Sequence, residues 1–229
     1  MGTERPDLRY EVKSVIPSTE LPRVKFWLRL HPAAFRVAYP PRSVNSLYFD
    51  SPDRLGFQEN LSGIAERRKL RLRWYGETLD RVTPTLELKC KQGLLGWKES
   101  HRFEEEIALE GVRWPALRAT LRERLPERFR SLLDLAGEPV LLVRYERAYL
   151  VSADGLIRAT VDADVTAVDQ TRHASLRAGP PEPVPDDVVL EVKCSEDDRG
   201  RLEQVLGEWP LRVGRNSKFA RGMASLPNL

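Results

Sequence analysis

Cysteine, methionine and histidine are scarce in this sequence. Its 229 residues include 2 cysteines, 2 methionines and 3 histidines. Two cysteines do not make a disulfide framework, and the histidines (His31, His101 and His173) show no spacing typical of metal ligands. No Ser-His-Asp or Cys-His arrangement stands out either. The sequence therefore excludes a disulfide scaffold and gives no indication of covalent catalysis.

A strong net charge and long apolar runs are also lacking. The 37 basic residues are nearly balanced by 34 acidic ones, so the net charge is only +3. This balance argues against a polycationic protein that binds nucleic acid through uncompensated charge. No apolar run is long enough to cross a bilayer, and the charged start, MGTERPDLRY, predicts no signal peptide. We expect a cytoplasmic protein that would reach a membrane only through a partner protein.

What the sequence does contain is one short pattern, three times over. An apolar residue, Glu, an apolar residue and Lys follow one another in YEVK (10–13), LELK (86–89) and LEVK (190–193). Cys90 and Cys194 come directly after the second and third copies, so both should be buried free thiols on apolar strand faces. Because the copies lie near both ends of the chain and would share one sheet, we expect a single domain over residues 1–229.

Alternation of apolar and charged residues with a period of two predicts β-strands. Eight segments show it: 8–16, 44–50, 69–75, 85–91, 97–109, 140–151, 156–165 and 188–194. A turn at 153–155 should join two of them into a hairpin, and the short connections favour antiparallel pairing. Apolar residues at helical spacing predict helices, which are 18–30 (capped by Ser18 or Thr19), 114–125, 197–209 and a short one from Ser51 through Leu61. The Pro-rich segment 171–187 reads as a loop.

The polar faces of these strands are almost entirely ionic. They carry Arg9, Glu11 and Lys13; Lys69, Arg71 and Arg73; Glu87, Lys89 and Lys91; Arg158, Asp162 and Asp164; and Glu191 and Lys193. Such faces can meet bulk water on a half-buried sheet. Alternatively, eight strands can close into a barrel with helices outside, which turns the charges inward. From the alternation alone both interpretations stay open.

An inward face of this kind would need a ligand. Like charges a few ångströms apart repel by about 4 kcal/mol per pair at an effective dielectric constant near 20. Phosphate relieves this repulsion, since arginine matches its oxygens with two parallel hydrogen bonds and lysine adds positive charge. Carboxylates on the same face could hold Mg²⁺ or Mn²⁺ that bridges phosphates.

The ordered motifs YEVK, KLRLRWY, LELK, RYERAYL, IRATVDADV, LEVK and NSKFARGM resemble the VTC (vacuolar transporter chaperone) domain of polyphosphate polymerases. That domain belongs to the triphosphate tunnel metalloenzymes, relatives of the CYTH group. The resemblance runs from about Arg9 to Gly222, nearly the whole chain. It implies an α+β fold, in which an eight-stranded antiparallel β-barrel forms a triphosphate tunnel and helices pack outside.

Carried over residue by residue, the resemblance implies a set of phosphate ligands, which are Lys13, Arg71, Arg73, Lys89, Lys98, Arg147, Arg158, Lys193 and Lys218. Glu191 would be the principal metal ligand. The residues with catalytic roles would be Arg71, Arg73, Lys89, Arg158 and Glu191. Two positions stay open, since Arg102 lies close to Lys98, and strict alternation puts Arg144 rather than Arg147 on one strand face.

The acidic residues have two interpretations each. Glu11 and Glu87 are candidate metal ligands, but they could equally hold the basic residues in place as ion pairs. Asp162, with Asp164, could bind a metal or remain solvated near a turn. Likewise, Arg71 with Arg73, and Glu191 with Lys193, could form ordinary surface pairs. Lys218 lies in NSKFARG, a segment that looks too polar for a core.

One departure from the family concerns the metal site. The CYTH signature is Glu-x-Glu-x-Lys, whereas this chain reads Arg9-Tyr10-Glu11-Val12-Lys13. Loss of the first acid removes a metal ligand and adds positive charge, which is more similar to the polymerase branch. We therefore expect synthesis of polyphosphate from ATP with Mn²⁺ or Mg²⁺. The alternatives are a tripolyphosphatase or nucleoside triphosphatase, a non-catalytic polyphosphate sensor and, least of all, a nucleic-acid binder.

Overall fold

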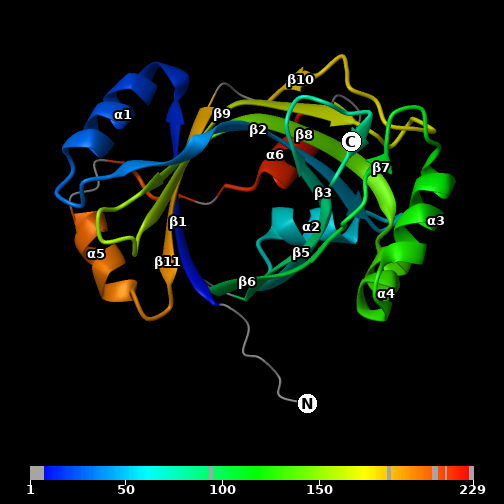
Figure 1. Cartoon of the computed structure of the whole chain (residues 1–229), viewed down its shortest axis with the longest axis horizontal. Coiled ribbons are helices and arrows are strands. Elements are labelled where there is room, and N and C mark those ends of the chain that lie inside the picture. The colour runs from blue at the N-terminus through cyan, green and yellow to red at the C-terminus, as the bar shows by residue number, and fades with distance from the viewer. Residues whose placement is uncertain (1–7, 93–94, 185–186, 208–210, 215, 227–229) are drawn as a thin grey trace.

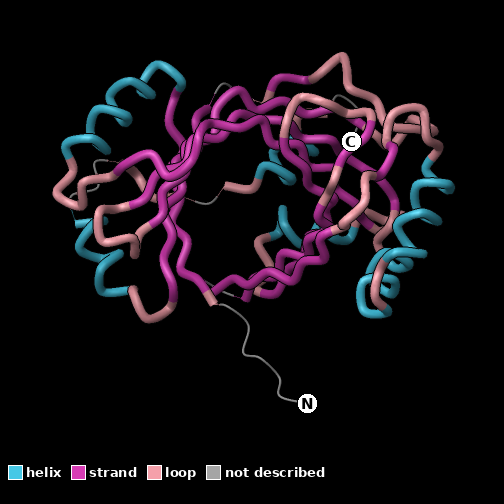
Figure 2. The backbone as a smooth tube through the Cα atoms, in the orientation of Figure 1, coloured by secondary structure: helices cyan, strands magenta, loops and turns pink. Residues whose placement is uncertain are grey.

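Eight antiparallel strands form a closed ring in this computed structural model, which describes residues 8–92, 95–184, 187–207, 211–214 and 216–226 (Figures 1 and 2). Around the ring the order is β9-β11-β1-β6-β5-β3-β2-β8, and β8 pairs with β9 to close it. The ring strands are β1 (Arg9–Pro17), β2 (Arg36–Asp50), β3 (Glu66–Tyr75), β5 (Thr85–Gln92), β6 (Leu95–Arg102), β8 (Glu138–Val151), β9 (Arg158–Asp169) and β11 (Asp187–Ser195). The α+β fold with an eight-stranded antiparallel ring, which the family resemblance implied, is confirmed.

Three short strands lie outside the ring order. β10 (Glu182–Pro183) adds to the edge of β9, inside the Pro-rich segment expected to be only a loop. β4 (Arg81–Val82) and β7 (Ile107–Ala108) form a separate two-stranded sheet. The strand predicted over 97–109 is therefore wrong in extent. β6 ends at Arg102. Soon after it, the run Glu104-Glu105-Glu106 interrupts the alternation of apolar and polar residues.

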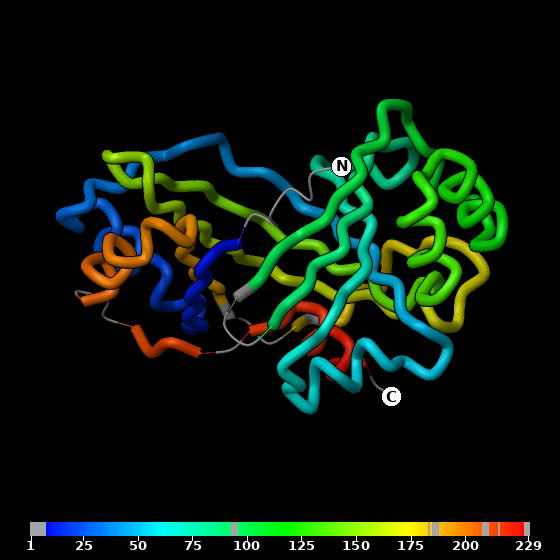
Figure 3. Tube along the Cα trace, turned by 90° about the horizontal axis from the view of Figure 1, so that it is seen from below, coloured from blue at the N-terminus to red at the C-terminus, as the bar shows by residue number. Residues whose placement is uncertain are grey.

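Helices pack on the outside of the ring on two opposite sides (Figures 1 and 3). α1 (Leu21–Leu30) and α5 (Arg199–Gly207) bury Val24, Leu28, Leu202 and Val205 against β1, β9 and β11. α3 (Trp114–Arg124) and α4 (Glu127–Leu135) cover the outer faces of β2, β3, β5 and β6. Cys90 and Cys194 are buried and free, one in each of these two cores, as expected.

The C-terminal helix α6 (Lys218–Ala224) packs instead on the inner face of the ring (Figure 1). Phe219 and Met223 are buried with Tyr48, Val143 and other inward-facing residues of β2, β8 and β9. α2 (Leu55–Ser62) lies beside α6, and its Phe57 contacts the Phe219 ring edge-on. The expectation that this basic segment is too polar for a core is wrong, since every third or fourth residue of α6 is apolar or small. Together α6 and α2 fill one end of the ring.

Neither predicted helix cap is the cap in the structure. Ser18 and Thr19 fall in a 3-10 turn, η1 (Ser18–Glu20), so Glu20 takes the cap position of α1. Arg54, with a positive φ of 58°, takes the cap position of α2, although Ser51 Oγ accepts the Leu55 backbone N–H at 3.0 Å. No helix in the described part of the chain combines the length and hydropathy that a bilayer crossing requires.

The close packing of α6 against β8 and β9 depends on Gly222, which gives a first prediction. A Cβ at this position would lie 2.8 Å from Leu141 Cδ2 and 3.3 Å from Ala167 Cβ. Gly222→Leu should therefore push α6 away from β8 and β9 and lower the free energy of unfolding by about 1–3 kcal/mol. Urea unfolding measures this. Gly200→Leu in α5 is the matched control, because nothing lies within 4 Å of its added Cβ; equal losses in both variants would contradict the packing described.

Candidate functional site

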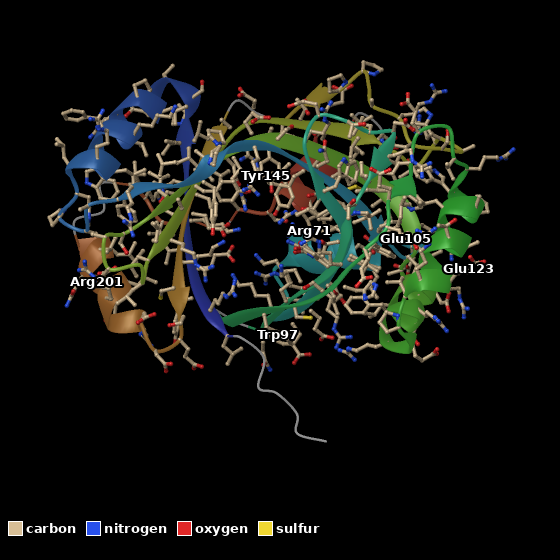
Figure 4. The ribbon with its side chains drawn as sticks, in the orientation of Figure 1. Arg71, Trp97, Glu105, Glu123, Tyr145 and Arg201 are labelled. Atoms are coloured by element: carbon tan, nitrogen blue, oxygen red, sulfur yellow. The ribbon has the colours of Figure 1, made fainter. Side chains whose placement is uncertain are left out.

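The charged faces of the strands meet inside the ring around one cavity of about 450 Å³. Figure 4 shows Arg71 and Tyr145 within the ring, whereas Glu105, Glu123 and Arg201 lie on its outside. Among the described residues, ten basic ones line the cavity, which are Arg9, Lys13, Lys69, Arg71, Arg73, Lys89, Lys98, Arg147, Lys193 and Lys218. Glu11 and Glu191 are the acidic residues in this part of the lining. Of the two orientations that the alternation left open, the inward one is present.

Three adjacent strands place their basic residues in rows across this cavity. Lys69 of β3, Lys89 of β5 and Lys98 of β6 are register partners. In the next inward-facing row, Arg71 is the partner of Glu87. The period of two along each strand and the antiparallel register together place residues of like charge next to one another on adjacent strands.

Glu87 neutralises part of this charge from a buried position. Its carboxylate lies 2.6 Å from Arg71 Nη2, 2.8 Å from Lys98 Nζ and 3.5 Å from Arg73 Nη1. Burial alone would raise the pKa of Glu87, but Arg71, Arg73 and Lys98 outweigh it and hold that pKa far below its usual range. Glu87 therefore stays ionised and orients the basic residues, which is the ion-pair alternative for this residue.

On the opposite wall, β1 and β11 place two carboxylates around one lysine. Lys13 Nζ lies 2.6 Å from Glu11 Oε1 and 3.1 Å from Glu191 Oε2. Burial would lower the pKa of Lys13, but Glu191 and Glu11 raise it well above its ordinary value. Burial would raise the pKa of Glu191, and Lys13, Lys89 and Lys193 hold it well below. Both carboxylates are ionised and face the cavity.

The third wall combines β8, β9 and α6 through Asp162. This carboxylate is fully buried and accepts hydrogen bonds from Arg147 at 2.5 and 2.7 Å and from Lys218 at 2.5 Å. The Lys218 ammonium lies 4.7 Å from the centre of the Tyr145 ring. Burial would raise the pKa of Asp162, but Lys218 and Arg147 lower it. Asp162 thus connects α6 to the ring strands and holds Arg147 and Lys218 at the cavity wall.

Arg147, rather than Arg144, faces the cavity. Tyr145 and Arg147 share the inner face of β8, and Arg144 lies on the other face, where it donates to Asn45 Oδ1 at 3.0 Å. A register shift occurs between Arg144 and Glu146 in the pairing with β9, where Asp164 has a positive φ of 54°. This bulge leaves Asp164 exposed and removes it from the inner face.

The remaining predicted residues divide into two groups. Lys98 lines the cavity, whereas Arg102, four residues further along β6, is exposed and does not. Arg158 is also exposed and lies outside the cavity lining; it lines an adjacent hollow of about 480 Å³ and is the register partner of Lys193. Lys193 lines both spaces.

The cavity also contains residues that were not predicted as site residues. Arg9 and Lys69 line it; the alternation placed both on the ionic strand faces, but the family resemblance did not assign them a role. Tyr48 and Tyr145 also line it. The Tyr48 hydroxyl accepts a hydrogen bond from Arg71 at 3.2 Å, and the Tyr145 hydroxyl accepts one from Arg73 at 3.1 Å. Their inward position follows only from the strand register.

Two carboxylates of the cavity could hold a divalent cation. Among the described residues no three Asp, Glu, His or Cys side chains converge as a complete metal-binding group. Glu87 and Asp162 lie behind the cations that they bind, whereas Glu11 and Glu191, although also paired with lysines, are the described carboxylates that line the cavity. Mg²⁺ is commonly held by one or two carboxylates with substrate phosphates and water completing its shell.

The family model of the VTC domain matches residues 8–227. The chain belongs to the VTC domain family. The resemblance read from its motifs is thereby confirmed. No curated protein matches the sequence.

Two solved structures resemble this VTC domain at low identity. "A putative adenylate cyclase" from Vibrio parahaemolyticus is 12% identical, with a TM-score of 0.52, over 93% of this chain and 97% of that one. A chain of the Schizosaccharomyces pombe Mediator head module is 10% identical, with a TM-score of 0.47, over 90% of this chain and 97% of that one. At 12% identity the first likeness shows the fold alone.

The role of Asp162 in this VTC domain gives a second prediction. Asp162→Asn removes a buried charge that is shared by Arg147 and Lys218. The free energy of unfolding should fall by about 3 kcal/mol, because two cations lose their compensation. Denaturant unfolding at neutral pH measures this. The control is Asp134→Asn, which removes a carboxylate bound by Arg122 on the exposed surface and should change stability little; comparable losses would contradict a special role for Asp162.

Lys69 gives a third prediction, because it is a buried lysine among cations. Its Nζ donates to Ser217 Oγ at 2.7 Å, and among the described residues it has no carboxylate partner. Burial, then Lys89, Lys13 and Arg71, lower the pKa of Lys69 to about 6. A polyanion in the cavity favours its charged form, so tripolyphosphate affinity should rise as pH falls from about 8 to about 6, by up to about tenfold per pH unit.

Calorimetric titration with tripolyphosphate, with Lys69→Arg as the matched variant, measures this effect. Arginine stays charged throughout this range, so its variant lacks the proton uptake that Lys69 contributes. Protonation of the ligand itself is common to both proteins and cancels in the comparison. Identical pH slopes for the two proteins would show that Lys69 is already charged in the free cavity.

Proposed function

We propose that this VTC domain transfers phosphoryl groups on a nucleoside triphosphate or polyphosphate bound inside the ring, and that its main reaction is the synthesis of polyphosphate from ATP. One observation carries the proposal. Ten basic side chains of the described residues line one cavity inside the ring, and four carboxylates lie among or behind them. At about 4 kcal/mol per close pair of like charges, such a cavity is stable only with a polyanion or water inside.

Condensed phosphate fits this cavity better than other anions. It is narrow, long and densely charged, and its oxygens match the paired N–H groups of Arg71, Arg73 and Arg147. These three guanidiniums come from two different strands, so they can grip successive phosphates. A nucleic-acid duplex is far wider than a ring of eight strands can admit. We therefore assign the cavity to triphosphate and polyphosphate.

The chain's own residues act by binding and by stabilising charge. An ionised oxygen on the terminal phosphate of the growing chain attacks the γ-phosphorus of ATP. The bond between the γ-phosphorus and the β–γ bridging oxygen breaks, ADP leaves with that electron pair, and the chain is one phosphate longer. Arg71, Arg73 and Arg147 hold the triphosphate in line and spread its negative charge, which is the main requirement of phosphoryl transfer.

The state of the lining carboxylates favours this transfer over hydrolysis. A phosphate acceptor is already ionised at neutral pH, so it needs no proton acceptor from the protein. Water must lose a proton, and Glu11 and Glu191 are weak bases because neighbouring lysines hold their pKa values below the ordinary range. Release of orthophosphate by hydrolysis is the second candidate function.

A divalent cation, Mn²⁺ or Mg²⁺, would be held by Glu11 and Glu191 and would neutralise charge on the bound phosphates. Lys13 lies between these two carboxylates, with Lys89 on Glu11 and Lys193 near Glu191. We also propose that the protein works in the cytoplasm, in keeping with its two free thiols, and that a membrane protein partner would account for any membrane association.

The fourth prediction tests the activity itself. The protein is incubated with ATP and Mn²⁺ or Mg²⁺, and long-chain polyphosphate and free phosphate are followed separately. Chain growth supports the polymerase, release of phosphate alone supports the hydrolase, and tight polyphosphate binding without turnover supports a sensor. Glu191→Gln should lower metal-dependent turnover by about a hundredfold while the basic residues retain polyphosphate binding. Unchanged turnover in this variant would contradict the assigned metal site.

A further inference from the structure

The open end of the ring, opposite α6, carries a cluster of aromatic residues around one arginine. Tyr39, Tyr75 and Tyr149 surround Arg42, whose guanidinium carbon lies 5.4, 5.8 and 5.8 Å from the centres of their rings. Tyr39 and Tyr149 contact each other edge-on at 5.9 Å. The side chains of Tyr39 and Tyr75 are 57% and 51% exposed, so each keeps a free surface. We call these four residues the mouth cluster.

The mouth cluster lies one inward-facing step beyond the phosphate cavity. Tyr75 follows Arg73 by two residues on β3, Tyr149 follows Arg147 by two residues on β8, and Arg42 is the register partner of Arg147. Two residues of a strand span about 7 Å. A triphosphate held by Arg73 and Arg147 would therefore have its next chemical group, a ribose and a base, at the level of this cluster.

The position of Arg42 in the cluster is not explained by an ion pair. Among the described residues, no carboxylate lies within ion-pair distance of Arg42. Burial raises the pKa of Tyr149 to about 12, so its ring is neutral at physiological pH. An arginine plane and two half-exposed tyrosine rings are instead the groups on which nucleobases stack.

The adjacent hollow of about 480 Å³ adds a second, independent observation. It is lined by Tyr39, Tyr149 and Thr160, and it shares Lys193 with the phosphate cavity. Thr160 is only 3% exposed, yet its Oγ1 has no hydrogen-bond partner. Buried hydroxyls are normally paired, and a ligand hydroxyl at this place would supply the missing bond.

We propose that the mouth cluster is a nucleoside-binding site, where the base of the nucleoside triphosphate stacks on Tyr39 and Tyr75 and a ribose hydroxyl pairs with Thr160. This inference rests on the proposed function, since it assumes that the triphosphate lies in the cavity. It divides recognition between two parts of the ring. The basic cavity binds any condensed phosphate, and the mouth cluster adds affinity for those that carry a nucleoside.

Calorimetry with two probes, ATP and inorganic tripolyphosphate, tests this division; the metal is left out so that neither probe is turned over. Tyr75→Ala and Tyr39→Ala should each weaken ATP binding by about tenfold, the effect of losing one aromatic stacking partner. Tripolyphosphate affinity should stay the same. Tyr75→Phe keeps the ring and should retain ATP affinity. Phe26→Ala, which removes an equally exposed ring on α1, is the control and should change neither.

The outcomes separate the two proposals. If the wild-type protein binds neither probe, the proposed function fails. If it binds both but the tyrosine variants leave ATP affinity unchanged, only the mouth site fails. If ATP and tripolyphosphate weaken equally, the mouth binds phosphate and the nucleoside assignment is wrong. A second measurement needs no variant. The fluorescence of a nucleoside triphosphate that carries the base 2-aminopurine should be quenched when it binds to the wild-type protein. Unchanged emission at saturation would contradict stacking of the base.

Discussion

Mutual repulsion among ten cations is the constraint on which this molecule is built. The cations can face one another only because four carboxylates are placed among and behind them, each shared by two or three basic groups. Glu87 holds Arg71, Arg73 and Lys98, and Asp162 holds Arg147 and Lys218. Four carboxylates cannot neutralise ten cations, so the cavity retains an excess of positive potential. That excess is the physical basis for binding a polyanion.

The same constraint explains the distribution of apolar residues. A ring whose interior is ionic cannot have its main core inside, so the apolar faces of the strands turn outward and need covering. α1 and α5 cover the outer strand faces on one side of the ring and α3 and α4 those on the opposite side, as two separate cores. Only where α6 enters the ring does a third, inner core form, and it closes one end. The opposite end stays open, and the mouth cluster lies there.

The carboxylates divide into two kinds by what they face. Glu87 and Asp162 point toward cations and act as fixed counter-charges, whereas Glu11 and Glu191 border the space where a ligand would lie. The first kind determines the geometry of the guanidiniums before a ligand arrives. Preorganised charge of this type is what phosphoryl transfer requires, because little covalent chemistry is asked of the protein.

The eight ring strands follow from local alternation, and so does the gathering of most charged residues on one face of each strand. The sequence determines both by itself, because a period of two separates the two faces of any strand. Lys13, Arg71, Arg73, Lys89 and Lys193 were predictable in this way. Tertiary structure alone decided which side of the sheet is inside, since closure depends on the pairing of β8 with β9. It also decided the position of α6, the choice of Arg147 over Arg144, the place of Arg158 outside the cavity, and the mouth cluster. Each of these depends on contacts between segments far apart in the chain, and no local pattern encodes such contacts.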